Sequence, residues 1–72
     1  MTTRRFEMIA GGSFKFYEVT VTGCSVSVRY GRIGTNGQSQ TKSFHTEDEA
    51  QRHADKLISS KIAKGYAELV VR

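Results

Sequence analysis

The residues with the greatest capacity for chemistry form one run, from Val28 to Asn36. Within it, Arg29 and Arg32 flank an aromatic ring, Tyr30, and a glycine, Gly31. Guanidinium groups bind phosphates through paired hydrogen bonds, and an aromatic ring stacks on a sugar or a base. Gly31 has no side chain to limit the approach of a ligand. The combination predicts a nucleic-acid-binding site made by these four residues.

A structural interpretation of the same run stays open. Side chains alternate along a strand, so Val26, Val28 and Tyr30 share one face and Arg29 points to the other. Arg32 falls on the face of Tyr30 by the same count. In this interpretation Tyr30 completes a core face that Val26 and Val28 begin, and both arginines are solvated.

The charge distribution also favours a polyanionic partner. The net charge is +4, and residues 1–45 hold six Lys or Arg against two Asp or Glu, while residues 46–72 hold five of each. Cations near phosphates gain affinity by releasing counterions, so Lys15 and Lys42 are further candidates for phosphate contacts. The alternative is that the excess charge only keeps a small protein soluble.

The remaining reactive side chains do not form a catalytic or metal-binding set. Cys24 is the only cysteine, and with His45 and His53 it has no recognised ligand spacing. We expect a half-buried thiol, no metal, no cofactor, no small-molecule substrate and no enzymatic activity.

Length and hydropathy predict one domain over residues 1–72. No apolar run approaches the roughly 20 residues that cross a bilayer, and the start of the chain is too charged for a signal peptide. We expect a cytoplasmic monomer with no membrane association.

Alternating apolar residues and glycine turns predict four strands before any helix. Gly11-Gly12, Gly23-Cys24 and Asn36-Gly37 are the turn signals between them. A fifth, short strand follows the helix. The predicted strands are residues 4–10, 14–22, 25–33, 38–44 and 66–71.

One amphipathic helix is predicted after Thr46, whose hydroxyl can cap it in a capping box with Glu49. Gly65 is placed to end it. Its expected apolar stripe consists of Ala50, Ala54, Leu57, Ile58 and Ile62. The fold class is therefore α+β, an antiparallel sheet of four to five strands with one helix packed on one face. The uncovered face is expected to hold Ile9, Phe14, Phe16 and Ile33 beside cations.

The chain resembles a WGR domain from about Arg4 to Tyr66. The resemblance rests on these segments in the order of the family: Arg5-Phe6-Glu7, residues 15–19, residues 28–34, Gly37-Gln38 and residues 41–44, followed by a helix with an acidic start. One departure is that Tyr30 stands where the family has its tryptophan. Tyrosine keeps a stacking face but loses the indole N–H donor.

The family is best known from DNA-dependent poly(ADP-ribose) polymerases, where the domain contacts DNA at a break and neighbouring domains. Bacteria also have it, alone or in proteins similar to molybdate metabolism regulators. The resemblance implies that Tyr30 and Arg32 are recognition residues. It implies no ADP-ribosyltransferase activity, because that region does not occur in this chain.

Two hypotheses follow. The first is a non-catalytic nucleic-acid-binding module, with DNA as the favoured ligand and little sequence specificity. In it Arg29, Lys15 and Lys42 contact phosphates, Tyr30 stacks, and Arg32 supports the turn or contacts the backbone. The second is a protein-interaction module that docks a partner protein or a catalytic subunit through the open sheet face.

Overall fold

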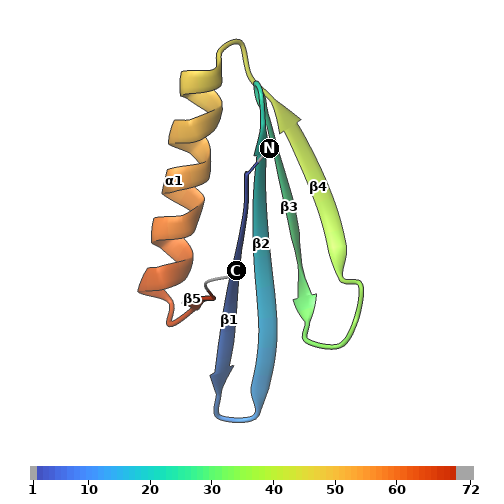
Figure 1. The fold of residues 1–72 in the computed structure, drawn as a ribbon. Helices are drawn as coiled ribbons and strands as arrows, with labels where there is room; N and C mark the ends of the chain where they lie inside the picture. The colour runs from blue at the N-terminus through green and yellow to red at the C-terminus, as the bar shows by residue number, and fades with distance from the viewer. Residues whose placement is uncertain (1, 70–72) are drawn as a thin grey trace.

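The computed structural model describes residues 2–69 as a five-stranded antiparallel sheet with one helix on one face (Figure 1). The strand order is β4-β3-β2-β1-β5. The elements are β1 Thr2–Ala10, β2 Ser13–Thr22, β3 Ser25–Arg32, β4 Gln38–Ser43, α1 Glu47–Ala63 and β5 Ala67–Leu69. The α+β class and the single packed helix predicted from the sequence are confirmed.

Glycine turns set the register of the sheet. The turn at Gly23 joins β2 to β3, and Gly23 has φ +58°, a conformation that costs a residue with a Cβ atom more than it costs glycine. The two residues of this turn place Tyr17 opposite Tyr30 and Lys15 opposite Arg32. The length of this turn therefore fixes the register between β2 and β3.

The core lies between α1 and the sheet. Its sheet side consists of Phe6, Tyr17, Val19 and Val26, and its helix side of Ala50, Ala54 and Ile58. Alanine at two of the three helix positions lets α1 approach the strands closely, because its side chain is a single methyl group. Tyr30 and Val28 are half-buried against this core.

Both predicted ends of α1, with Thr46 as N-cap and Gly65 just after the last turn, are found in the structure. The Glu49 N–H donates to the Thr46 hydroxyl at 3.1 Å, and that hydroxyl lies 3.3 Å from a Glu49 carboxylate oxygen. At the other end Gly65 N–H donates to the Ile62 carbonyl and Tyr66 N–H to the Lys61 carbonyl, the pattern of a Schellman motif. This motif brings Tyr66 back beside the last turn of α1.

One helix position was predicted wrongly: Ile62 is 51% exposed. Residues spaced by four drift about 40° around a helix at each step, so Ile62 lies about 120° from Ala50. Lys61, by contrast, lies about 20° from Ala50 and faces the sheet.

Strand ends differ from the prediction by one or two residues. β3 ends at Arg32 and β4 at Ser43, one residue earlier than expected, although the Ile33 N–H still donates to the Phe14 carbonyl at 2.8 Å. β5 covers Ala67–Leu69 and pairs with β1. The predicted end of this strand, residues 70 and 71, lies outside the described residues.

The face away from α1 holds the expected aromatic and aliphatic residues in two different states. Ile9 is 64% exposed and its cross-strand partner Phe14 is 47% exposed. Phe16, on the same face, is only 1% exposed. It is covered by the guanidinium groups of Arg5 and Arg29, 4.7 and 5.1 Å from the ring centre. Phe16 thus lies on the predicted face beside cations, and those cations cover its ring.

Candidate nucleic-acid interface

The strand alternation divides the run of predicted site residues between two surfaces. Tyr30 lies on the face that α1 covers, while Arg29 lies on the opposite face with Glu18, its cross-strand neighbour. Lys15 and Arg32 are cross-strand partners at the end of the sheet where the β1–β2 hairpin extends past α1 (Figure 1). The predicted residues therefore do not form one site.

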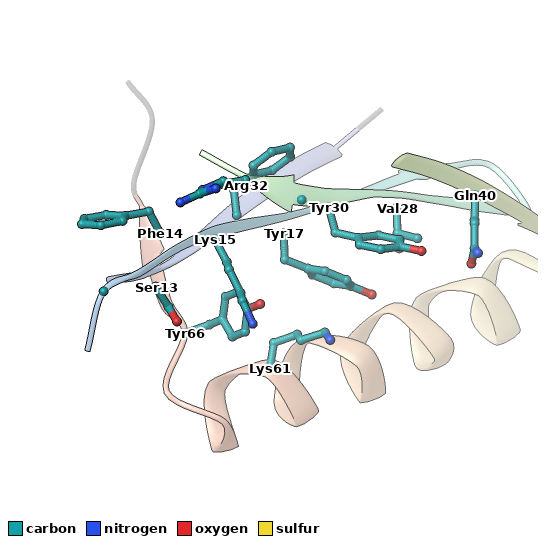
Figure 2. Close-up of a pocket in the computed structure, with 13 residues that line it drawn as sticks. Ser13, Phe14, Lys15, Tyr17, Val28, Tyr30, Arg32, Gln40, Lys61 and Tyr66 are labelled. Carbon is teal, nitrogen blue, oxygen red and sulfur yellow. The ribbon is translucent and has the colours of Figure 1, made fainter. Parts of the chain in front are cut away.

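A cleft of about 660 Å³ opens beside Tyr30, between the last turn of α1 and strands β2 and β3. We call it the tyrosine cleft and define it by six of its lining residues: Lys15, Tyr17, Tyr30, Arg32, Lys61 and Tyr66. Figure 2 shows Lys15, Lys61 and the rings of Tyr17 and Tyr66 around one space, with Arg32 at the rim on the side of Phe14.

Three tyrosine rings form the aromatic wall of the cleft. The ring centres of Tyr17 and Tyr30 are 6.2 Å apart, and those of Tyr17 and Tyr66 are 6.4 Å apart in an edge-on arrangement. Tyr17 is 6% exposed, so it supports the wall from behind. Burial, followed by the proximity of Tyr30 and Tyr66, raises the pKa of the Tyr17 hydroxyl, which keeps it neutral. Tyr30 and Tyr66 are half-buried.

Lys61 is positioned by the aromatic wall. Its Nζ atom lies 4.6 Å from the ring centre of Tyr17 and 5.8 Å from that of Tyr66, within range of cation–π attraction. Burial, and then the nearby charges of Lys64 and Lys15, lower the pKa of the Lys61 amine. An anion in the cleft would oppose that shift, because it stabilises the charged form.

The cleft is positively charged and has no counter-charge in the part of the chain that the structure describes. No Asp or Glu is among its lining residues. The ion pairs among residues 2–69 involve Arg4, Arg5, Arg29 and Arg52, and none involves Lys15, Arg32 or Lys61. Three cations around tyrosine rings can bind an anionic ligand that also has a flat or apolar part.

Tyr30 combines both interpretations that the sequence left open. Its ring packs against the core, as the structural interpretation predicts, and it also lines the cleft. Its hydroxyl donates to the Gln38 side-chain oxygen at 3.3 Å, across to β4. A ring fixed on two sides is a preorganised stacking surface.

Arg29 is engaged within the protein. Its Nη2 atom lies 2.9 Å from a Glu18 carboxylate oxygen, and Nη1 donates to the Asn36 carbonyl at 3.4 Å. Arg5 binds the other oxygen of Glu18 at 2.6 Å. Burial raises the pKa of the Glu18 carboxyl, but hydrogen bonds from Arg5 and Arg29 outweigh it, so the net shift is downward. The charge of Arg29 is therefore compensated.

Gly31 has a structural reason to be glycine that the sequence did not indicate. A Cβ atom on Gly31 would lie 2.8 Å from the Cα of Gly37, and one on Gly37 would collide with the Tyr30 carbonyl and lie 2.8 Å from the Phe16 ring. The two glycines let the β3–β4 turn fold against Phe16. Gly31 thus permits the close approach of the Gly37 backbone, which belongs to the same chain.

Lys42 lies on the helix side of the sheet but outside the tyrosine cleft. It is opposite Val26 on the edge strand β4, and its amine is 5.5 Å from the ring of Phe44. It lines a second hollow of about 530 Å³ together with His53 and Leu57.

The sequence prediction missed Tyr17, Lys61 and Tyr66. Two features of the sequence could have indicated Lys61 and Tyr17. The spacing of Lys61 from Ala50 places it in the middle of the stripe that faces the sheet, and the turn at Gly23 places Tyr17 opposite Tyr30. The position of Tyr66 depends on β5 returning to β1, which local patterns do not specify.

Two absences hold for residues 2–69, the part of the chain that the structure describes. In that part of the chain no helix is long and apolar enough to span a membrane. Nor does it contain a group of three or more His, Cys, Asp or Glu side chains that could bind a metal ion. Cys24 is a half-buried free thiol there.

Comparison with known proteins identifies the class. The family model of the WGR domain matches residues 2–71, so the chain belongs to the WGR family, and it is a module of the nucleic-acid-binding type.

The chain is also similar to particular proteins. Among them are the Escherichia coli K12 proteins YfeS, described as uncharacterized, and YehF, each 43% identical over 56 residues, or 78% of this chain. A crystal structure of a Bacteroides fragilis protein superposes with a TM-score of 0.91 at 42% identity over 96% of this chain. The matched part covers 23% of YfeS, 20% of YehF and 20% of the Bacteroides chain. This chain thus corresponds to about a quarter or less of the length of these relatives.

Proposed function

We propose that this domain is a non-catalytic module that binds DNA through the tyrosine cleft, mainly by contacts to the sugar-phosphate backbone. The main support is the set of three lining cations, with Lys15 and Lys61 beside the tyrosine rings and Arg32 at the rim, and no carboxylate among the lining residues. Membership in the WGR family supports the same class of ligand.

Each part of the cleft has a role in this proposal. Lys15, Arg32 and Lys61 contact phosphates, and the exposed parts of the Tyr30 and Tyr66 rings stack on a sugar or an unpaired base. Of the predicted phosphate contacts, Arg29 is left out because Glu18 already binds its guanidinium group.

Little sequence specificity is expected. Reading base edges in the major groove requires an exposed helix or strand that fits the groove. α1 instead packs against the sheet through Ala50, Ala54 and Ile58, and its first turn is acidic. The cleft can recognise a backbone and a flat ring, features that all sequences share.

The proposal is tested by fluorescence anisotropy with a labelled short duplex that has a free 5′-phosphorylated end, at about 50 and 200 mM salt. Wild-type protein is expected to bind, with an affinity that falls steeply between these concentrations. Tyr30→Ala is expected to weaken binding about fivefold or more, because stacking contributes about 1–3 kcal/mol per base. Tyr30→Phe keeps the ring and loses only the hydroxyl, so it should bind within about twofold of wild type.

Because Tyr30→Ala also removes a half-buried ring from the core, Lys61→Met provides a second variant. It should weaken binding and reduce the slope of log affinity against log salt by about 1. Binding that is insensitive to salt, or unchanged in both variants, would overturn the proposal. No binding at the lower salt concentration by folded protein would also overturn it and would favour the protein-interaction module.

A further inference from the structure

The tyrosine cleft continues into the second hollow. The two spaces share three lining residues, Tyr17, Val28 and Gln40, so they form one groove. This groove runs between α1 and the strands β3 and β4. Figure 2 shows Tyr30, Val28 and Gln40 following one another along it, on the sheet side facing the helix. We call the combined space the long groove.

The chemistry of the long groove changes along its length. Lys15, Arg32 and Lys61 lie at one end with the tyrosines. Val26, Val28 and Leu57 form an apolar middle section. Lys42 and His53 lie at the other end. Cations are thus present at both ends, and no Asp or Glu is among the lining residues of either part.

This pattern fits an elongated polyanion with flat apolar groups. Arg32, opposite Lys15, lies six residue steps along β3 from Val26, which is opposite Lys42. At strand spacing this is about 20 Å. About six nucleotides span that length at the 3.4 Å spacing of a duplex strand, and fewer when the strand is extended.

The apolar floor distinguishes single strands from duplexes. In a duplex the base faces are covered by neighbouring bases, so side chains inside a groove cannot stack on them without unpairing the base. In a single strand the base faces are accessible, and stacking on aromatic side chains works for every base. Tyr30 and Val28 would gain contacts from several unpaired bases of a single strand, whereas a duplex offers a stacking surface only at its open end.

We propose that the long groove binds a single-stranded segment of nucleic acid, with bases along Tyr30 and Val28 and phosphates bound by the three cations at one end and by Lys42 at the other. This inference rests on the proposed function and narrows its ligand to unpaired strands or overhangs. Beyond Lys42 the chain leads into the acidic first turn of α1, Glu47 to Glu49, which repels phosphates and limits the segment at that end.

The test compares a labelled single strand of about six to ten nucleotides with a blunt duplex of the same sequence. Wild-type protein should bind the single strand more tightly. Affinity for oligonucleotides of increasing length should rise up to about six nucleotides and then level off.

Lys42→Gln is the decisive variant, because the Lys42 side chain is exposed and Lys42 pairs with Val26, four residues along β3 from Tyr30. It should weaken single-strand binding severalfold and reduce the salt slope by about 0.7, the value for one phosphate contact on a single strand. Its effect on the blunt duplex should stay within about twofold. Lys56→Gln, an equal loss of charge on the exposed side of α1, is the matched control and should change neither ligand by more than about twofold.

The outcomes separate the two proposals. Equal or tighter binding of the duplex, or an equal effect of Lys42→Gln on both ligands, overturns the single-strand inference and leaves the nucleic-acid module intact. Failure of both ligands to bind at low salt overturns both. Displacement of the strand by an acidic peptide of equal charge would show selection by charge alone and would also overturn the inference.

Discussion

On the sheet face away from α1, the guanidinium groups of Arg5 and Arg29 lie over the buried ring of Phe16 and share the carboxylate of Glu18. On the helix face, Lys61 lies over the ring of Tyr17 in a cleft without a carboxylate among its lining residues. Both regions combine cations with aromatic rings. Their difference is whether the protein itself supplies the counter-charge.

That difference separates a structural cluster from a candidate binding site. Where glutamate compensates the arginines and the ring is buried, the interactions are complete within the chain and stabilise the fold. Where cations remain uncompensated beside accessible rings, an external anion lowers the free energy of the site. The same residue types therefore indicate different roles on the two faces.

The largest effect is expected from Phe16→Ala. Removing a fully buried phenylalanine costs about 3–5 kcal/mol, which is similar to the total that a core of this size supplies. The variant should be largely unfolded at 25 °C, as measured by urea unfolding followed by circular dichroism. Phe14→Ala, on the same strand and face but half exposed, is the control and should cost less than about 1.5 kcal/mol. Equal losses in the two variants would show that the cluster does not stabilise the fold.

A smaller loss of stability is expected from Glu18→Gln, and it should depend on pH. The pKa of Glu18 is lowered in the folded state, so its contribution is present above its ordinary pKa of 4.5 and is lost as the pH falls through the folded value. At pH 7 the variant should be less stable by about 1–2 kcal/mol, between the values for exposed and buried ion pairs.

As the pH falls from 7 through the folded pKa of Glu18, the stability difference between the two proteins should narrow, because Glu18 then becomes protonated in the wild type as well. The lowered pKa of Glu68, which its hydrogen bond to Arg4 causes, acts in the same direction in both proteins and cancels in the comparison. Unfolding free energies of both proteins, measured from pH 7 down into the acid range, give the size of the effect. A difference that does not change with pH would exclude an ionic contribution from Glu18.

The smallest effect is expected from substitutions of Arg29 and Arg32. These two arginines test the comparison between the two faces of the sheet most directly. Arg32→Gln should weaken DNA binding several-fold and reduce the salt slope by about 1, while stability changes by less than about 0.5 kcal/mol. Arg29→Gln should do the reverse, with DNA affinity within about twofold and stability lower by about 1 kcal/mol. Anisotropy titrations and urea unfolding of both variants provide the data. An equal loss of DNA affinity in Arg29→Gln and Arg32→Gln would show that the ion pair with Glu18 does not prevent Arg29 from binding DNA.

The fold was predictable where local signals are strong. Thr46, Gly65 and the glycine turns act within a few residues of themselves, so the helix and four strands were placed to within one or two residues. The prediction for Ile62 was wrong because residues spaced by four do not follow a straight line along a helix, which turns once in 3.6 residues.

The candidate site was only partly predictable. The sequence predicts Tyr30, Arg32 and Lys15, which line the cleft, but it also predicts Arg29, which strand alternation places on the opposite face of the sheet. The cleft also needs Tyr66, which reaches it through the Schellman motif and the pairing of β5 with β1. Contacts between segments so far apart in the chain depend on the whole fold, and local pattern does not encode them.

The packing of Gly31 against Gly37 has a consequence for how such chains are found and sorted. A search pattern centred on aromatic-glycine-arginine selects sequences in which this turn can close. The middle residue must be glycine because the backbone of Gly37 leaves no room for a Cβ atom there. Such a pattern therefore detects the backbone conformation of the β3–β4 turn and does not detect a ligand. Sorting the retrieved chains by what they bind would require other sequence positions, those of Lys15, Lys61 and Tyr66, which are distant along the sequence from the motif that gives the family its name.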